Sequence, residues 1–162
     1  MLAWQITLAG SGALLTVSLS CIVPFAAIAF LAARTMSRRA AAIVIGLAVM
    51  ANQIVGFAYL HYPRTADAYV WIPFFAIGAY ASLAVALRVR SPIFGFALAF
   101  GTFEFVIFVA SVATGSAATF ELPIELRVAG ANLLGFGALG AAYVAIAAID
   151  QLAHRPIVRA ER

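Results

Sequence analysis

Residues 92–113 read PIFGFALAFGTFEFVIFVASVA, an apolar run interrupted by one charged side chain, Glu104. A helix of this length spans about 33 Å, close to the roughly 30 Å thickness of the hydrocarbon core of a bilayer. The run lacks the apolar–polar alternation of a membrane barrel strand. A helix, in contrast, satisfies its own backbone hydrogen bonds in lipid. The stretch therefore predicts a transmembrane helix.

Four further apolar runs make up most of the remaining chain. Of the 162 residues, 65% are hydrophobic and 10% are charged, whereas soluble domains have about 45–50% apolar and about 25% charged residues. With Cys21 as the only cysteine, this composition excludes a soluble globular enzyme, a disordered chain and a disulfide-stapled secreted domain. We expect an all-α polytopic membrane protein, one domain over residues 1–162 built as a bundle of five transmembrane helices. The expected spans are about 6–33, 40–61, 68–87, 92–113 and 126–149.

The basic residues predict the orientation of these spans, because cytoplasmic loops of membrane proteins carry an excess of them. All ten are arginine. Only Arg64 and Arg127 fall on one side of the expected bundle, and the others follow the first, third and fifth spans. The N-terminus is therefore expected outside and the C-terminus in the cytoplasm. The arginines on the cytoplasmic side are Arg34, Arg38, Arg39, Arg88, Arg90, Arg155, Arg159 and Arg162.

The same arginines are spread in small groups between apolar runs, whereas a nucleic-acid binder gathers its basic residues on one face or tail. We expect a lipid bilayer as the main partner and no nucleic acid. Arginine without lysine, with abundant alanine and glycine, is typical of a GC-rich bacterial genome. The predicted location is the bacterial cytoplasmic (inner) membrane.

Glu104 is unusual because charged side chains are rare within membrane-spanning segments. It lies about 18 Å into its span, near the midplane, where a charged side chain costs roughly 2.5–3.5 kcal/mol to insert. Asn52 and Gln53 fall at the same depth of the second span, and Asn132 lies about 9 Å from the outer boundary of the fifth. We predict that these four residues form an intramembrane polar site facing other helices.

Two interpretations of this site remain open at the level of sequence. In the first, Glu104 binds or relays a proton or small cation, since intramembrane acids are by default candidates for function. In the second, a neutral Glu104 is hydrogen-bonded to Asn52 or Gln53 and only holds helices together, worth about 0.6 kcal/mol per bond.

His61, Arg64 and Asp67 form the only dense polar loop and are a second candidate site for docking a partner or a quinone head group. The alternative is a turn in an aromatic belt with a weak Arg64–Asp67 ion pair. His61 and His154 should lie roughly 30 Å apart, a bilayer thickness, so the chain predicts no metal site and no cofactor. It also offers no nucleophile–base pair, so no catalytic residue is predicted and an enzyme is not expected; a membrane enzyme acting on lipid, with Glu104 or His61 as general base, is the least favoured function.

Two functions follow from these observations. The first is a small inner-membrane transporter or permeation protein, proton- or cation-linked, that uses Glu104 with Asn52 and Gln53 and works as a homo-oligomer. The alternative is a non-catalytic subunit or assembly factor of a larger membrane complex, since the chain shows no soluble domain and many small-residue stripes suited to helix packing.

Overall fold

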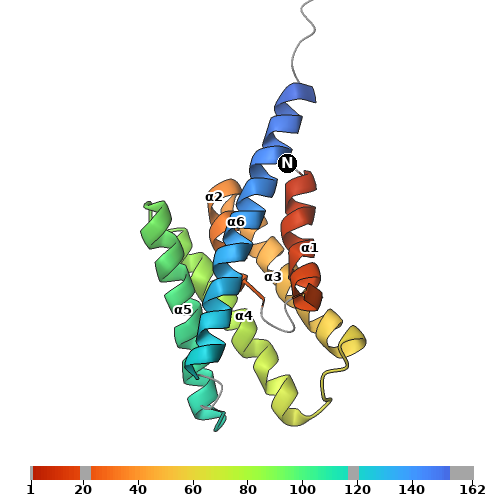
Figure 1. The fold of residues 1–162 in the computed structure, drawn as a ribbon, viewed down its shortest axis with the longest axis vertical. Coiled ribbons are helices and arrows are strands. Elements are labelled where there is room, and N and C mark those ends of the chain that lie inside the picture. The colour runs from red at the N-terminus through yellow and green to blue at the C-terminus, as the bar shows by residue number, and fades with distance from the viewer. Residues whose placement is uncertain (1, 19–22, 117–120, 154–162) are drawn as a thin grey trace, which may run out of the picture.

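The computed structural model describes residues 2–18, 23–116 and 121–153, and these residues are helical with short connections (Figure 1). Strands are absent from these described ranges. The elements are α1 Leu2–Ser18, α2 Phe25–Thr35, α3 Arg38–Ile54, the π-helical turn η1 Val55–Tyr59, α4 Ala66–Ala86, α5 Pro92–Ala113 and α6 Leu122–Ala153.

Four of the helical segments are long and apolar enough to cross a membrane. They coincide, within a few residues, with the predicted spans 40–61, 68–87, 92–113 and 126–149. The prediction of an all-helical protein of membrane-spanning composition is confirmed. The four segments are Arg38–Tyr59, Ala66–Ala86, Pro92–Ala113 and Leu122–Gln151.

Three of these helices begin at a serine or threonine whose side chain caps the first turn. Ser37 accepts a hydrogen bond from the Ala40 amide, Thr65 from the Ala68 amide and Ser91 from the Phe94 amide. Each cap satisfies one of the amide groups that a helix leaves unpaired at its start. The local sequence therefore sets where α3, α4 and α5 begin.

The predicted single span 6–33 is wrong, because this segment forms two helices that run in opposite directions. The indole Nε1 of Trp4, at the start of α1, donates a 2.7 Å hydrogen bond to Oγ1 of Thr35, at the end of α2. The rings of Trp4 and Tyr143 on α6 also lie 5.1 Å apart. The start of α1 and the end of α2 therefore lie at the same end of the bundle (Figure 1).

This arrangement also corrects the prediction that the N-terminus and the first arginine cluster lie on opposite sides of the membrane. The guanidinium of Arg34 donates to the carbonyls of Val89 (3.0 Å) and Arg90, which ties the end of α2 to the α4–α5 connection. α6 also finishes at this end (Figure 1). The sequence pattern missed the reversal because an uninterrupted apolar run of this length is equally compatible with one tilted helix.

α2 is the centre of the bundle. All its residues from Phe25 to Ala32 are buried, and it contacts α3, α4, α5 and α6. A helix that is apolar on every side is expected to be surrounded by other elements. Because α2 has only 11 residues and Pro24 before it is buried, the start of this helix lies inside the protein.

The packing of α1 on α3 provides a test of the hairpin arrangement. A Cβ atom added at Gly12 would lie 2.6 Å from the backbone oxygen of Ala48 on α3, whereas one added at Gly10 meets nothing within 4 Å. We expect Gly12→Ala to destabilise the protein by roughly 1–3 kcal/mol through overpacking. Thermal unfolding in detergent measures this.

Gly10→Ala is the matched control, because it makes the same change on the same helix. We expect it to leave stability unchanged or to raise it by up to about 1 kcal/mol, the helix-propensity difference between the two residues. Equal stabilities of the two variants would contradict the packing of α1 against α3.

Candidate functional site

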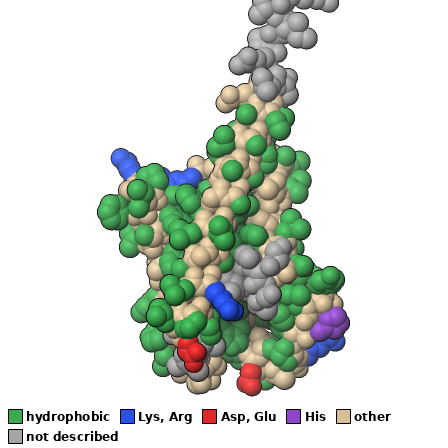
Figure 2. Space-filling model, in the orientation of Figure 1, with side chains coloured by type: hydrophobic (Ala, Val, Ile, Leu, Met, Phe, Trp, Pro, Cys, Tyr) green, Lys and Arg blue, Asp and Glu red, His purple; other side chains and the backbone are tan. Residues whose placement is uncertain are grey.

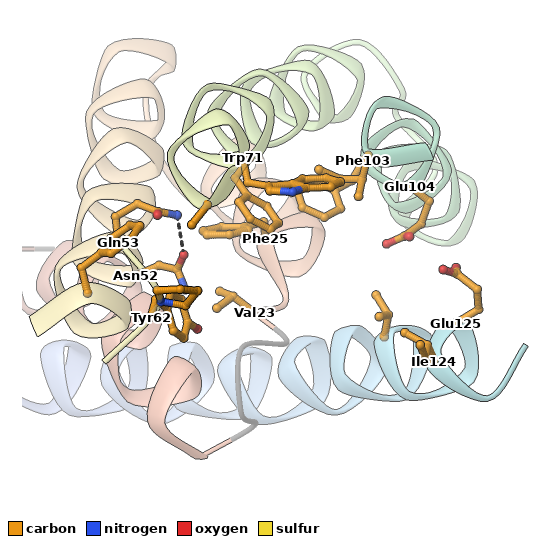
Figure 3. Close-up of a pocket in the computed structure, with 16 residues that line it drawn as sticks. Val23, Phe25, Asn52, Gln53, Tyr62, Trp71, Phe103, Glu104, Ile124 and Glu125 are labelled. Carbon is orange, nitrogen blue, oxygen red and sulfur yellow. Dashed lines mark hydrogen bonds between the residues drawn. The ribbon is translucent and has the colours of Figure 1, made fainter. Parts of the chain in front are cut away.

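A cavity of about 440 Å³ lies beside the start of α2 (Figure 3). Its lining comes from the five helices α2–α6, from η1, and from residues just before α2 and just after η1. The polar lining residues are Asn52, Gln53, Glu104 and Glu125; the aromatic ones are Phe25, Phe57, Tyr62, Trp71, Phe75 and Phe103; the others are Val23, Pro63, Ala68, Ile107, Ile124 and Val128.

Amide side chains form one side of the cavity. Nε2 of Gln53 donates a 2.9 Å hydrogen bond to Oδ1 of Asn52, and Nδ2 of Asn52 donates a 2.8 Å bond to Oγ1 of Thr16. Thr16 in turn donates to the Gly12 carbonyl on α1. Since both amide atoms of Asn52 are bonded, Asn52 joins α1 to α3 and fixes Gln53 at the cavity wall.

Two carboxyl groups form the opposite side. Glu104 on α5 and Glu125 on the first turn of α6 point toward one another (Figure 3), and their carboxyls interact electrostatically. Oε1 of the half-buried Glu104 is shielded from solvent and has no hydrogen-bond partner in the described part of the chain. A buried carboxylate oxygen without a partner is unfavourable. A proton on one carboxyl, or a cation bound between the two, would stabilise this pair.

Aromatic side chains separate the amides from the carboxyls. The ring of Phe75 lies 6.0 Å from that of Trp71, 6.3 Å from that of Phe25 and 6.5 Å from that of Phe103, between centroids. Phe25 and Phe103 are 5.8 Å apart. These four residues, from α2, α4 and α5, form a continuous aromatic wall between the two polar sides.

The structure brings Glu104, Asn52 and Gln53 to one cavity, but it does not join Glu104 to either amide. The aromatic wall lies between them, and Glu104 faces Glu125 instead (Figure 3). The hypothesis of a direct hydrogen bond from Glu104 to Asn52 or Gln53 therefore does not hold in this structure.

Asn132 lies outside the cavity and has a structural role. It is 1% exposed, its Oδ1 accepts a 3.3 Å hydrogen bond from the Ala27 amide, and its Nδ2 donates to the Val128 carbonyl. Pro24 provides no side-chain cap for α2. Asn132 therefore supplies, from another helix, the acceptor that the buried start of α2 needs.

The outer-loop candidates His61, Arg64 and Asp67 are exposed and do not line the cavity. Arg64 and Asp67 make no ion pair with each other in the described ranges. His61 adopts a positive φ of 57° and its Nδ1 lies 2.7 Å from the Tyr59 carbonyl oxygen. What this loop contributes to the cavity is its next two residues, Tyr62 and Pro63.

Tyr62 reaches the cavity because of the π-helical turn and a glycine. The Leu60 amide bonds the Val55 carbonyl and the Tyr62 amide bonds the Gly56 carbonyl at 3.0 Å. A Cβ atom at Gly56 would lie 2.3 Å from the Tyr62 ring. The loop therefore packs its tyrosine directly on the helix backbone, which only glycine allows.

Glu125 is a cavity residue that was not among the candidates predicted from the sequence, although an acid is favoured near a helix start for electrostatic reasons alone. The helix does begin at Leu122, which places Glu125 in its first turn, but its side chain also faces Glu104. No ion pair joins Glu125 to Arg127 within the described residues. Position along the chain did not single out Glu125, because Asp67 and Asp150 also border predicted spans.

Comparison of the chain with protein-family models, with curated proteins and with solved structures gives no match. Function must be inferred from the cavity itself. Within residues 2–18, 23–116 and 121–153, no three His, Cys, Asp or Glu side chains lie close enough together to hold a metal ion.

The amide side of the cavity leads to a prediction about coupling between α1 and α3. We expect Asn52→Ala and Thr16→Val each to lower the free energy of unfolding. The double variant should lose about 1 kcal/mol less than the sum of the two single losses, because both substitutions remove the same interhelical hydrogen bond. Unfolding in detergent of the two single variants and the double variant measures the coupling.

Thr7→Val provides the control for this cycle. Thr7 is on the same helix and donates to the carbonyl four residues earlier, as Thr16 does, but it has no bond to α3. Its effect should add to that of Asn52→Ala, and equal coupling for Thr7 and Thr16 would contradict the assigned network.

Proposed function

We propose that the protein is a proton- or cation-linked transporter or permeation protein of the bacterial cytoplasmic membrane, with Glu104 as its ion-binding carboxyl. The observation that carries this proposal is the buried, unpartnered Oε1 of Glu104 beside a second carboxyl on one side of a cavity among membrane-length helices. A purely structural role would have favoured a side chain whose polar atoms are all bonded.

The chemistry that the pair supports is exchange of a proton for another cation. Two facing carboxylates repel each other, and this repulsion is relieved either by one shared proton or by a bound positive charge. Because the two states exclude each other, binding of a cation would release a proton. Such competition is the minimum requirement for linking proton movement to solute movement.

The proposed orientation places the arginine-rich end of the bundle in the cytoplasm. Arg34, Arg88 and Arg90 lie at the end where α1 begins, α2 ends and α6 finishes, while Arg64 and Arg127 lie toward the other. With α1 and α2 as a hairpin entering from one side, four helices span the bilayer. Both termini are then cytoplasmic, in keeping with the excess of basic residues there.

Cysteine accessibility tests this orientation. In a Cys21→Ser background, single cysteines at Leu2 and Arg39 should react with a membrane-impermeant maleimide only after the cytoplasmic side is opened. Cysteines at Ala66 and Glu121 should react in intact cells. If the cysteine of the Leu2→Cys variant were labelled in intact cells, the result would support the five-span arrangement and contradict the hairpin.

Proton flux tests the role of Glu104. Proteoliposomes loaded with a pH-sensitive dye should acidify after an external pH drop faster than empty liposomes. We expect Glu104→Gln to lower the protein-dependent rate at least tenfold, because an amide cannot exchange the proton.

Glu121→Gln is the control for this assay, since Glu121 is exposed and lies outside the cavity. It should retain the rate of the wild-type protein. A Glu104→Gln rate equal to that of Glu121→Gln would refute the proposed role.

A non-catalytic subunit or assembly factor stays the alternative, and it predicts a stoichiometric partner in mild detergent. It offers no reason for a carboxyl pair in a cavity, so the transport proposal explains more of the described residues. Recovery of the chain alone, as a monomer or homo-oligomer, would count against the alternative.

A further inference from the structure

The cavity is built for an occupant much larger than an ion. Its volume of about 440 Å³ falls in the roughly 300–1,000 Å³ range of small-molecule sites. A bare proton or metal ion would occupy only the space between the two carboxyls and leave the aromatic wall without a role. The size of the cavity therefore indicates an organic ligand.

The charges of the lining indicate the sign of that ligand. Glu104 and Glu125 are the two carboxylic acids in it, and arginine and lysine are absent from its described lining. An anionic ligand would face two carboxyls with no compensating group. A positively charged ligand would instead place its charge between Glu104 and Glu125 and satisfy the unpartnered oxygen of Glu104.

The uncharged lining indicates the body of the ligand. Trp71, Phe75, Phe25 and Phe103 form the aromatic wall beside the carboxyls. Aromatic faces attract cations as well as apolar groups, and rings stack favourably on other rings. A hydrated inorganic cation would gain nothing from this wall, whereas an aromatic or alkyl body would be removed from water.

We propose that this cavity binds an amphipathic organic cation, with its positive charge between Glu104 and Glu125 and its apolar body against the aromatic wall. This inference rests on the proposed function in one respect, because it identifies the cation that would exchange with the proton. Gln53, on the opposite side of the cavity, offers an amide to any polar group at the far end of the ligand.

The test uses tetraphenylphosphonium and tetraphenylborate as probes, because they share the same tetraphenyl shell and carry opposite charges. Binding to the full chain in an uncharged detergent is measured by titration calorimetry and by tryptophan fluorescence, with empty micelles subtracted. Trp71 lines the cavity and Trp4 does not, so a fluorescence change that disappears in Trp71→Phe reports the cavity.

We expect saturable binding of the phosphonium and none of the borate. Glu104→Gln and Glu125→Gln should each weaken phosphonium binding at least tenfold, and Glu121→Gln should not change it. If Glu104→Gln fails to fold, Glu125→Gln, in the more exposed first turn of α6, provides the same test.

The aromatic wall has its own matched pair of variants on α5. Phe103→Leu, at the wall, should weaken phosphonium binding several-fold, whereas Phe105→Leu, at a side chain that is 66% exposed, should not. Equal binding of both probes, as expected of an acyl-chain crevice, would overturn the proposal, as would the absence of saturable phosphonium binding.

Failure of this inference differs from failure of the proposed function. Proton flux that depends on Glu104 in a protein that does not bind phosphonium overturns the ligand class and retains the transport role. Phosphonium binding that depends on both carboxyls, in proteoliposomes without flux, retains the ligand class and overturns transport.

Discussion

The fold depends on burying the start of a short helix inside an apolar bundle. α2 begins at Phe25, after a buried proline, and its first residues are themselves buried. Unpaired backbone groups in such surroundings each cost several kcal/mol. Asn132 on α6 accepts a hydrogen bond from the Ala27 amide. Gly135 lets α6 lie close to Pro24, since a Cβ atom at this position would lie 2.7 Å from the Pro24 ring. This contact holds α6 against the centre of the bundle.

The cavity is a consequence of the same short helix. Because α2 occupies only part of the length of the bundle, the space beside its first residues is lined by Val23 and Phe25 and by the surrounding helices. The side chains bordering it are sorted by chemistry: bonded amides on α3, rings on α2, α4 and α5, and carboxyls on α5 and α6. On the face of the protein drawn in Figure 2 the coloured side chains are mainly hydrophobic, and many large apolar side chains are exposed, as expected for helices of membrane-spanning composition.

Depth along a helix was the most informative quantity that the sequence offered for the site. Counting residues from the start of each run placed Asn52, Gln53 and Glu104 in one layer, and all three border one cavity. The count could not find Glu125, because its helix begins at Leu122, four residues before the predicted span. The count of residues also could not show that Asn132 caps the start of α2 and does not line the cavity, because this role depends on the contact between α6 and α2.

The sequence by itself determined that the described part of the chain is helical, where four segments of membrane-spanning length lie, and which serine or threonine caps three of these helices, because composition, run length and capping are local properties. The tertiary structure alone decided that α1 and α2 run in opposite directions and that Glu104 faces Glu125. It also decided that Asn52 bonds Thr16. These outcomes depend on how helices lie against one another. Apolar segments alone do not specify which helices pack together. Small residues, aromatic rings and interhelical hydrogen bonds select one packing arrangement.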